Sequence, residues 1–270
     1  MRLAVKLGLL AATLALSAPT YAARVTPMSV DLSTSGRDSA TRIEFTNTED
    51  RELPVEIRMY HGVISESGEL QLEPADDKFL AFPPQVVMQP KTQQIFRVQY
   101  LPSEPLSKSE IYYAAISQVP VKLDPTVSKI QLVMRFNVLV NVVPDGAKPD
   151  AAVSWAKPTI RKPIEEMAPE ETAAKPAADP AAPAAPAPTE EKGIEVRIEN
   201  KGNRYFAAGR TNWTVTGTTA AGQPFSRSYT PSQIGSEIGM GVVPPGGARV
   251  FFVELGEALA DGSVNVTIDK

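Results

Sequence analysis

Few residues in this chain carry side chains that could do covalent or acid–base chemistry. His61 is the only histidine and there is no cysteine, so a multi-histidine or cysteine metal site cannot form. The sequence also lacks the motifs of serine hydrolases, phosphate-binding loops and zinc proteases. We therefore expect no catalytic residue, no metal and no cofactor, and predict that the protein is not an enzyme.

Carboxylate pairs at Glu165–Glu166, Glu170–Glu171 and Glu190–Glu191 are the remaining candidates for acid–base catalysis. A general acid and a general base must be held in a fixed geometry. All three pairs lie in or beside residues 163–192, which are mostly Ala, Pro, Glu, Thr and Lys around the run PAADPAAPAAPAP. This composition has too little apolar bulk to form a core, so we predict that the segment is disordered.

The first 22 residues have the pattern of a secretory signal peptide. Arg2 and Lys6 form a basic start, Leu7–Leu16 is too short an apolar run to span a bilayer, and Thr20–Ala22 offers a small-x-small cleavage site. An uncleaved membrane anchor is the alternative. We expect cleavage near Ala22 and no membrane insertion, because no later apolar run reaches about 18 residues.

The charge of the exported chain argues against nucleic acid as a partner. Removing Arg2 and Lys6 from the 27 basic residues leaves 25 against 31 acidic residues, a net charge of −6. A net negative charge does not attract nucleic acid or anionic lipid.

The longest regular pattern is Lys129–Pro144, KIQLVMRFNVLVNVVP, which predicts a strand from Lys129 to Val143. Its alternate positions are all apolar: Ile130, Leu132, Met134, Phe136, Val138, Val140 and Val142. At about 3.3 Å per residue such a strand would extend roughly 50 Å, far beyond the usual five or six residues. A strand longer than its sheet leaves unpaired backbone groups, with which another chain can pair.

Shorter alternating runs recur along the rest of the chain and predict an all-β fold of sandwich type. No ten-residue window shows a convincing apolar stripe of helical period. Pro83 and Pro84 suit an edge strand or a bend. The strand-like runs are Arg42–Asn47, Leu53–Tyr60, Phe79–Met88, Gln94–Tyr100, Glu110–Ile116, Gly193–Asn200, Tyr205–Thr216, Gln223–Thr230, Arg249–Leu255 and Ser263–Asp269.

The pattern divides the exported chain into two domains, residues 23–144 and 145–270. Val153–Arg161 reads as a strand before the Pro/Ala-rich segment, and its Trp155 and Ile160 need a domain in which to be buried. We therefore predict that residues 163–192 are an insert between the first two strands of the second domain. An interdomain linker is the alternative.

Four motifs, in this order, resemble the PapD-like family of periplasmic pilus-assembly chaperones. They are RIEFTN at Arg42–Asn47, the block Phe82–Pro102 with its Pro-Pro pair, SEIYYAAISQVP at Ser109–Pro120, and the long run ending at Pro144. The second domain is similar only in outline, through IENKGNRYF and VVPPGGARVFF. The resemblance implies two immunoglobulin-like β-sandwich domains in an angled, boomerang arrangement.

The resemblance also implies a function. Chaperones of this family bind pilin or fimbrial subunits by donor-strand complementation, in which the long G1 strand fills a groove of the incomplete subunit, and deliver them to an outer-membrane usher. It implies a periplasmic location in a Gram-negative cell, and Ile130, Leu132, Met134 and Phe136 as the donated side chains. Alternatively, these residues fill the chaperone's own core, which we expect for Val138, Val140 and Val142.

The chain departs from the family at the site that anchors the subunit's C-terminal carboxylate. The family's Lys and Arg positions fall on Leu139 and near Pro27. Arg24 and Arg135 are the nearest substitutes, and an arginine fork suits a carboxylate. Alternatively, Arg24 belongs to a frayed N-terminus and Arg135 is a solvated edge charge.

Two other functions are weighed against a chaperone. A secreted structural subunit or adhesin of a surface appendage would usually have one such domain, a donor extension at its mature N-terminus and often a disulfide, whereas this chain has no cysteine. A generic immunoglobulin-like binding module would not need an over-long strand. The sequence therefore favours the chaperone.

Overall fold

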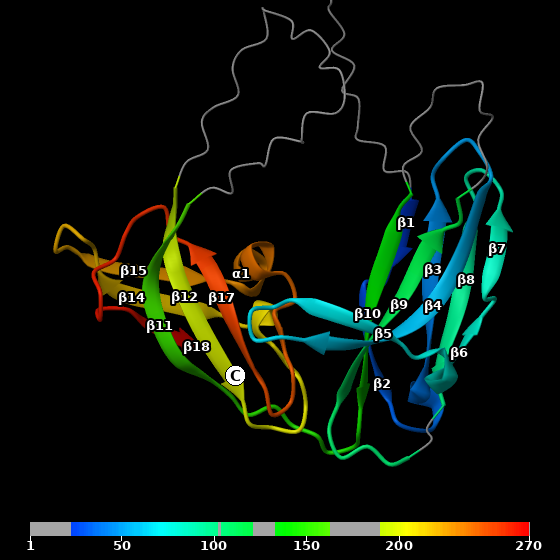
Figure 1. Cartoon of the computed structure of the whole chain (residues 1–270), viewed down its shortest axis with the longest axis horizontal. Helices are drawn as coiled ribbons and strands as arrows, with labels where there is room; N and C mark the ends of the chain where they lie inside the picture. The colour runs from blue at the N-terminus through cyan, green and yellow to red at the C-terminus, as the bar shows by residue number, and fades with distance from the viewer. Residues whose placement is uncertain (1–22, 102–103, 121–132, 163–189, 270) are drawn as a thin grey trace, which may run out of the picture.

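The computed structural model describes residues 23–101, 104–120, 133–162 and 190–269, and it is built almost entirely of β-strands. The predicted fold class, two immunoglobulin-like sandwiches set at an angle, is confirmed (Figure 1). The predicted signal peptide, residues 1–22, and positions 163–189 of the predicted insert lie outside the described residues. Residues 190–192 are described, and a strand already begins at Glu191.

The first domain contains two sheets around one core. Most inward positions of both sheets are apolar and buried, among them Ile43, Phe96 and Val140. One sheet has the order β1 (Ala23–Thr26), β3 (Ala40–Asn47), β8 (Gln93–Tyr100), β6 (Phe79–Phe82). The other has the order β2 (Ser29–Ser33), β10 (Arg135–Val143), β9 (Glu110–Gln118), β4 (Leu53–Ile64), β5 (Leu70–Pro74), with β7 (Gln85–Met88) also paired to β4.

Proline marks a place where the chain crosses between the two sheets. β6 pairs with β8 in one sheet and β7 pairs with β4 in the other, with Pro83 and Pro84 between them. The bend predicted for this proline pair is therefore present. Two short 3-10 turns, η1 (Arg37–Ser39) and η2 (Asp76–Lys78), complete the domain.

The second domain is a smaller sandwich centred on the fully buried Trp213. Its sheets are β11 (Ala151–Arg161), β12 (Glu191–Asn200), β17 (Ala248–Glu254); β13 (Phe206–Ala207), β16 (Val242–Val243); and β15 (Pro224–Tyr229), β14 (Trp213–Thr218), β18 (Asn265–Ile268). It also contains η3 (Ala208–Arg210). β11 and β12 are neighbours in one sheet, and the chain between them contains residues 163–189.

Two sequence expectations for this domain need correction. Trp155 and Ile160 are 37% and 52% exposed, so β11 is held by its pairing with β12 and not by burial of these two side chains. The domain also contains a helix, α1 (Pro231–Ile238), where only strands are expected. Thr230 and Gln233 form a capping box at its start, and its eight residues are too short to show a helical stripe in a ten-residue window.

The predicted long strand is also shorter than expected. β10 begins at Arg135, and Val133 and Met134 are described but lie outside any strand, whereas residues 129–132 lie outside the described part. The reason is the partner strand: β9 ends at Gln118, whose amide donates to the Met134 carbonyl at 3.0 Å, and Pro120 follows. The ladder therefore ends where β9 does.

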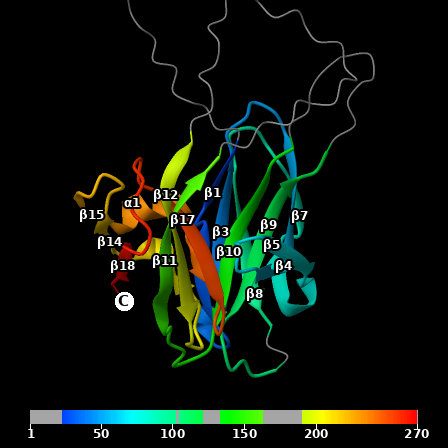
Figure 2. The same cartoon turned by 60° about the vertical axis from the view of Figure 1, so that its left-hand side comes forward.

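The two domains lie against each other over an apolar contact and several polar ones. Tyr205 and Val242 of the second domain form a buried cluster with Ile111 and Leu139 of the first. The β4–β5 hairpin reaches across to the second domain (Figures 1 and 2), where the Val250 amide donates to the Glu66 carbonyl at 2.8 Å. These contacts hold the two domains in a defined relative position.

Candidate functional site

The two faces of β10 have different surroundings. Val138, Val140 and Val142 point into the core of the first domain and are fully buried, as predicted. Of the alternate residues, Leu139 and Val143 face the second domain and belong to the interdomain cluster. One strand thus supplies both the core of its own domain and one wall of the space between the domains.

The two edges of β10 also differ along its length. On one edge β9 pairs with it from Arg135 to Val142. On the other edge β2 runs parallel to it but pairs only with residues 139–143, and the Leu139 amide donates to the Met28 carbonyl at 3.0 Å. Backbone groups alternate along a strand, so the amides of Arg135 and Asn137 point to the same side as that of Leu139. Among the described residues no strand pairs with them there.

The structure locates two of the four residues predicted to be donated. Met134 and Phe136 are half-buried against the first domain's own core, and the Phe136 ring meets that of Phe45 edge-on, with centroids 5.8 Å apart. Ile130 and Leu132 lie outside the described residues. Donation of these four side chains to a partner stays a prediction.

The two arginines predicted to anchor a carboxylate lie on different sheets. Arg24 is exposed on β1, in the sheet that does not contain β10. Arg135 is exposed at the start of β10, where its guanidinium lies 4.7 Å from the centre of the Tyr60 ring and its Nε donates to Asn137 Oδ1 at 3.1 Å. Within the described residues no contact joins the two, so they do not form one site.

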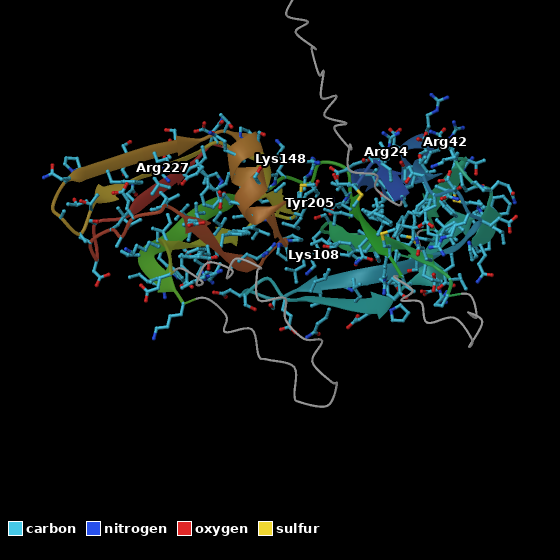
Figure 3. The ribbon with its side chains drawn as sticks, turned by 90° about the horizontal axis from the view of Figure 1, so that it is seen from above. Arg24, Arg42, Lys108, Lys148, Tyr205 and Arg227 are labelled. Atoms are coloured by element: carbon cyan, nitrogen blue, oxygen red, sulfur yellow. The ribbon has the colours of Figure 1, made fainter. Side chains whose placement is uncertain are left out.

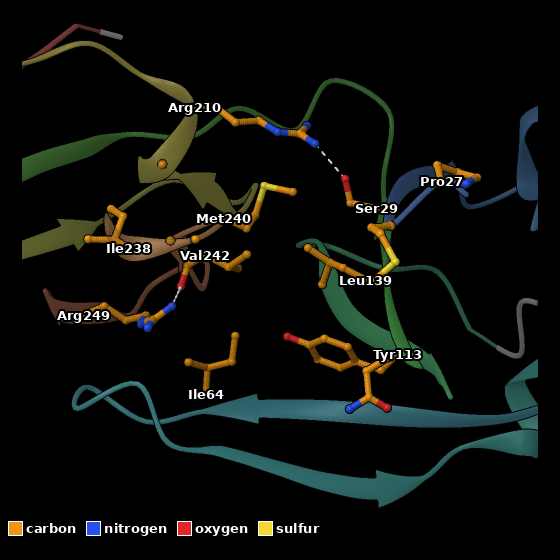
Figure 4. Close-up of a pocket in the computed structure, with 15 residues that line it drawn as sticks. Pro27, Ser29, Ile64, Tyr113, Leu139, Arg210, Ile238, Met240, Val242 and Arg249 are labelled. Carbon is orange, nitrogen blue, oxygen red and sulfur yellow. Dashed lines mark hydrogen bonds between the residues drawn. The ribbon is translucent and has the colours of Figure 1, made fainter. Parts of the chain in front are cut away.

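A cleft of about 750 Å³ lies between the two domains (Figure 4). Pro27 and Leu139, at which the family's anchoring cations fall by sequence count, both line it. The first-domain wall is completed by Ser29, Tyr113 and neighbouring residues. The second-domain wall consists of Gly209, Arg210, Ile238, Gly239, Met240, Gly241, Val242 and Arg249.

The cations of this cleft come from the second domain. The Arg210 Nη2 donates to Ser29 Oγ at 2.7 Å, across the domain boundary, and the Arg249 Nη1 donates to the Val242 carbonyl at 3.0 Å. Arg249 Nε is buried and has no hydrogen-bond partner among the residues that the structure describes. Burial lowers the pKa of the Arg249 guanidinium, an effect that Tyr113 only partly opposes. Motif comparison missed both arginines because only folding brings them opposite Leu139.

Asp31 on β2 fixes the wall that β2 and β10 share. Its carboxylate accepts hydrogen bonds from Asn141 Nδ2 at 2.9 Å, from the Tyr205 hydroxyl at 2.6 Å and from Arg204 Nη2 at 2.7 Å. Burial, and then the bond to Asp31, raise the pKa of Tyr205 to about 12. The second domain thus holds β2 in place on β10.

In the described part of the chain, His, Asp and Glu side chains do not gather in groups of three as they would around a metal ion. None of the helices there is long and apolar enough to cross a membrane.

Comparison with known proteins adds the following findings. Residues 24–148 match the family described as pili and flagellar-assembly chaperone, PapD N-terminal domain. A search of curated proteins found no match.

Solved structures similar to the chain include the class 5 fimbriae chaperone CfaA, with 11% identity, a TM-score of 0.49, and coverage of 92% of this chain and 99% of that one. The YadV chaperone has 14% identity, a TM-score of 0.49 and coverage of 92% of each chain. A chain from the CsuC–CsuE chaperone–tip adhesion subunit pre-assembly complex of Acinetobacter baumannii has 12% identity, a TM-score of 0.47, and coverage of 86% and 90%.

Proposed function

Because residues 24–148 make this chain a member of the PapD-like pili and flagellar-assembly chaperones, a family without enzymatic activity, we propose that it binds pilin or fimbrial subunits through β10 and delivers them to an outer-membrane usher. We further propose that residues 1–22 direct its export to the periplasm and are removed near Ala22. Residues 23–144 and 145–270 are then its two domains, with the Pro/Ala-rich segment as an insert in the second.

The observation that supports donor-strand complementation most directly is the one-sided pairing of β10. The backbone groups of Arg135 and Asn137 on the side away from β9 meet no strand in the described part of the chain. An extended segment of a partner can pair with such an edge by main-chain hydrogen bonds, while alternate side chains fill pockets and set the register. The apolar residues at alternate positions of Lys129–Phe136 provide those side chains.

The energy available to this mode of binding is large. Four side chains, Ile130, Leu132, Met134 and Phe136, would fill the subunit's groove. Burial of one such side chain contributes about 1.5–3 kcal/mol, so four contribute roughly 6–12 kcal/mol before the cost of ordering the segment. Met134 and Phe136 already contact their own core, so their share is smaller than that of Ile130 and Leu132.

We place the anchor for the subunit's C-terminal carboxylate in the interdomain cleft, at Arg210. Its guanidinium lines the same cleft as Leu139 and is bonded to the neutral Ser29 hydroxyl, and no carboxylate of the described residues forms an ion pair with it. Arg24 is on the other sheet of the first domain, and Arg135 already contacts Tyr60 and Asn137. Arg210 therefore fits a carboxylate better than either arginine suggested by the sequence.

The test compares two Asp substitutions on one segment. Leu132→Asp should leave the protein folded and exported but abolish capture of the cognate subunit, because a carboxylate would have to enter an apolar groove unpaired. Val140→Asp should instead unfold the chaperone, because Val140 is fully buried. Co-purification of the subunit from periplasmic extract, with a melting curve for each variant, separates the two. Wild-type capture by Leu132→Asp, or its unfolding, would contradict donation.

A further inference from the structure

The methionines that the structure describes fall into two groups by position. The chain has no cysteine, so methionine is its only side chain with a sulfur atom. Met59 and Met88 are 1% and 3% exposed, in the core of the first domain. The other described methionines, Met28, Met134 and Met240, are more accessible. These three lie in the interdomain cleft or on the segment that we assign to subunit binding.

Met28 is the most accessible of the described methionines, with 50% of its surface exposed. It lies between β1 and β2, and its carbonyl accepts a hydrogen bond from the Leu139 amide at 3.0 Å. This bond fixes the backbone of Met28 beside β10, and its side chain lines the cleft. An oxidant in the solvent can therefore reach the thioether, and the oxidised side chain would remain in the cleft.

The cleft around Met28 is lined largely by apolar side chains, among them Leu139 and Ile238. Met240, on the second-domain side of the cleft in Figure 4, packs against the interdomain cluster that contains Leu139 and Tyr205. Figure 3 shows Tyr205 at the boundary between the domains. Unbranched thioether side chains adapt their shape to irregular gaps, so this wall can pack against the apolar side chains of a ligand.

We propose that Met28 is a reversible oxidation site and that its sulfoxide lowers the affinity of the cleft for apolar ligands. The oxidant is hydrogen peroxide. The sulfur lone pair attacks one peroxide oxygen, the O–O bond breaks, and the departing hydroxide takes the proton from the new S–OH group and leaves as water. Sulfur is thereby oxidised by two electrons and peroxide is reduced. A methionine sulfoxide reductase reverses the step, as two thiols become a disulfide and the oxygen leaves as water.

The consequence for subunit binding rests on the proposed function. A sulfoxide is polar and accepts hydrogen bonds, so an apolar subunit side chain packed against Met28 would leave its oxygen without a partner. A subunit already bound in the cleft would cover Met28 and protect it. Oxidation would therefore act on the free chaperone and spare the complex.

The first experiment measures where peroxide acts on the full chain. Peptide mass spectrometry follows the uptake of oxygen by each methionine over time. Because oxidation follows accessibility, we expect Met28 to react about tenfold faster than Met59 and Met88, with Met240 between them. Oxidation of Met240 before Met28, or equal rates at Met28 and Met59, would overturn the proposal.

The second experiment measures the cleft with a dye, anilinonaphthalene sulfonate, whose apolar rings and sulfonate suit the apolar wall and Arg210. By fluorescence titration, we expect oxidation to lower its affinity at least about threefold, and methionine sulfoxide reductases for both epimers with dithiothreitol to restore it. Met28→Leu, which stays apolar but cannot be oxidised, should bind the dye as the wild type does before and after peroxide. Met28→Gln should bind it as weakly as the oxidised wild type.

Met88→Leu is the matched control, because it makes the same substitution in the core, away from the cleft, and should respond to peroxide as the wild type does. A loss of dye binding that is equally large in Met28→Leu, or no loss in the oxidised wild type, would overturn the proposal. Melting curves of all variants, recorded before and after peroxide, separate a change in the cleft from a loss of fold.

Capture of the subunit from periplasmic extract separates this inference from the proposed function. Treated wild type, freed of peroxide, should capture at least about threefold less subunit than untreated protein, and Met28→Leu should lose nothing. Unchanged capture after oxidation of Met28 would overturn the switch and leave the proposed function standing. Absence of capture by the untreated protein would contradict the proposed function, whereas the oxidation rates and the dye would still decide whether Met28 is the oxidation site.

Discussion

The two halves of β10 have the same alternating sequence pattern but differ in burial and in strand pairing. From Val138 to Val142 the inward side chains are fully buried, and from Leu139 to Val142 the strand is paired on both edges, with β9 and β2. From Arg135 to Asn137, β9 is the only described strand that pairs with β10, and the inward Phe136 is half-buried. The difference arises from the neighbours, because β2 ends its pairing at Leu139. Periodicity therefore tells which side of a strand is apolar, but the neighbouring strands decide whose core that side fills.

The largest expected effect on stability is the difference between a Val→Asp substitution inside β10 and one just before it. Val140→Asp should cost on the order of 5 kcal/mol or more in the free energy of unfolding, because it buries an unpaired charge, and should prevent folding at 25 °C. Val133→Asp, at a residue that is 47% exposed just before the strand, should cost less than about 0.5 kcal/mol. In urea denaturation, Val133→Asp should show a cooperative transition near that of the wild type, and Val140→Asp should show none. Similar costs would show that the two halves of the segment are equally buried.

Truncation of Phe136 should have an intermediate effect. Removing a fully buried Phe side chain costs about 3–5 kcal/mol, and Phe136 is only half-buried, so we expect Phe136→Ala to cost about 2 kcal/mol, including its contact with Phe45. Equilibrium urea unfolding gives the value. A cost as large as that of a fully buried aromatic residue would place Phe136 in the permanent core and weaken its assignment as a donated side chain.

Much of the first domain could be predicted from the sequence, because its strands and core positions depend on the alternation of apolar and polar residues over short runs. Alternation predicted a strand over Lys129–Val143, of which the structure forms Arg135–Val143, and it predicted Val138, Val140 and Val142 as core. The proline pair at 83–84, expected at an edge strand or a bend, lies where the chain crosses between sheets. These features depend on residues close in sequence. The all-β, two-domain fold followed from the same short runs.

The candidate site depended on contacts that no local pattern encodes. Asp31 and Asn141 are 110 positions apart, and Arg210 reaches Ser29 across 181 positions. Counting along the motif identified Pro27 and Leu139 as the positions that lack the family's cations, but could not show that arginines of another domain line the same cleft. The pattern likewise could not show that β10 begins only at Arg135, because β9 sets that limit.

The stability of residues 139–143 of β10, which pair with both β9 and β2, should depend on Tyr205 of the second domain. Tyr205→Phe removes a hydrogen bond to the Asp31 carboxylate, and we expect a loss of about 1.5 kcal/mol at pH 7. The folded-state pKa of Tyr205, about 12, lies above the ordinary tyrosine pKa of about 10. Its contribution is therefore complete below pH 10 and is lost as the pH rises from about 10 to about 12, when the unfolded state ionises first.

Stability of the wild type and of Tyr205→Phe, measured against pH, tests this linkage. The difference between the two should be constant up to about pH 10 and should shrink above it. Amide hydrogen exchange at residues 139–143 should also become faster in the variant, because Asp31 would hold β2 less firmly. A difference that grows above pH 10 would contradict the raised pKa.

The smallest effect is expected at the singly paired half, from Arg135→Gln. The guanidinium of Arg135 lies over Tyr60 at 4.7 Å and donates to Asn137, but the side chain is exposed. A cation–π contact at an exposed site contributes about 0.5–1 kcal/mol, so the loss in unfolding free energy should be about 0.5 kcal/mol. Hydrogen exchange at residues 139–143 should not change, because β2 and Asp31 do not contact Arg135. If exchange there became faster, the two halves would behave as one unit, and the edge we assign to a partner strand would be part of the chaperone's own sheet.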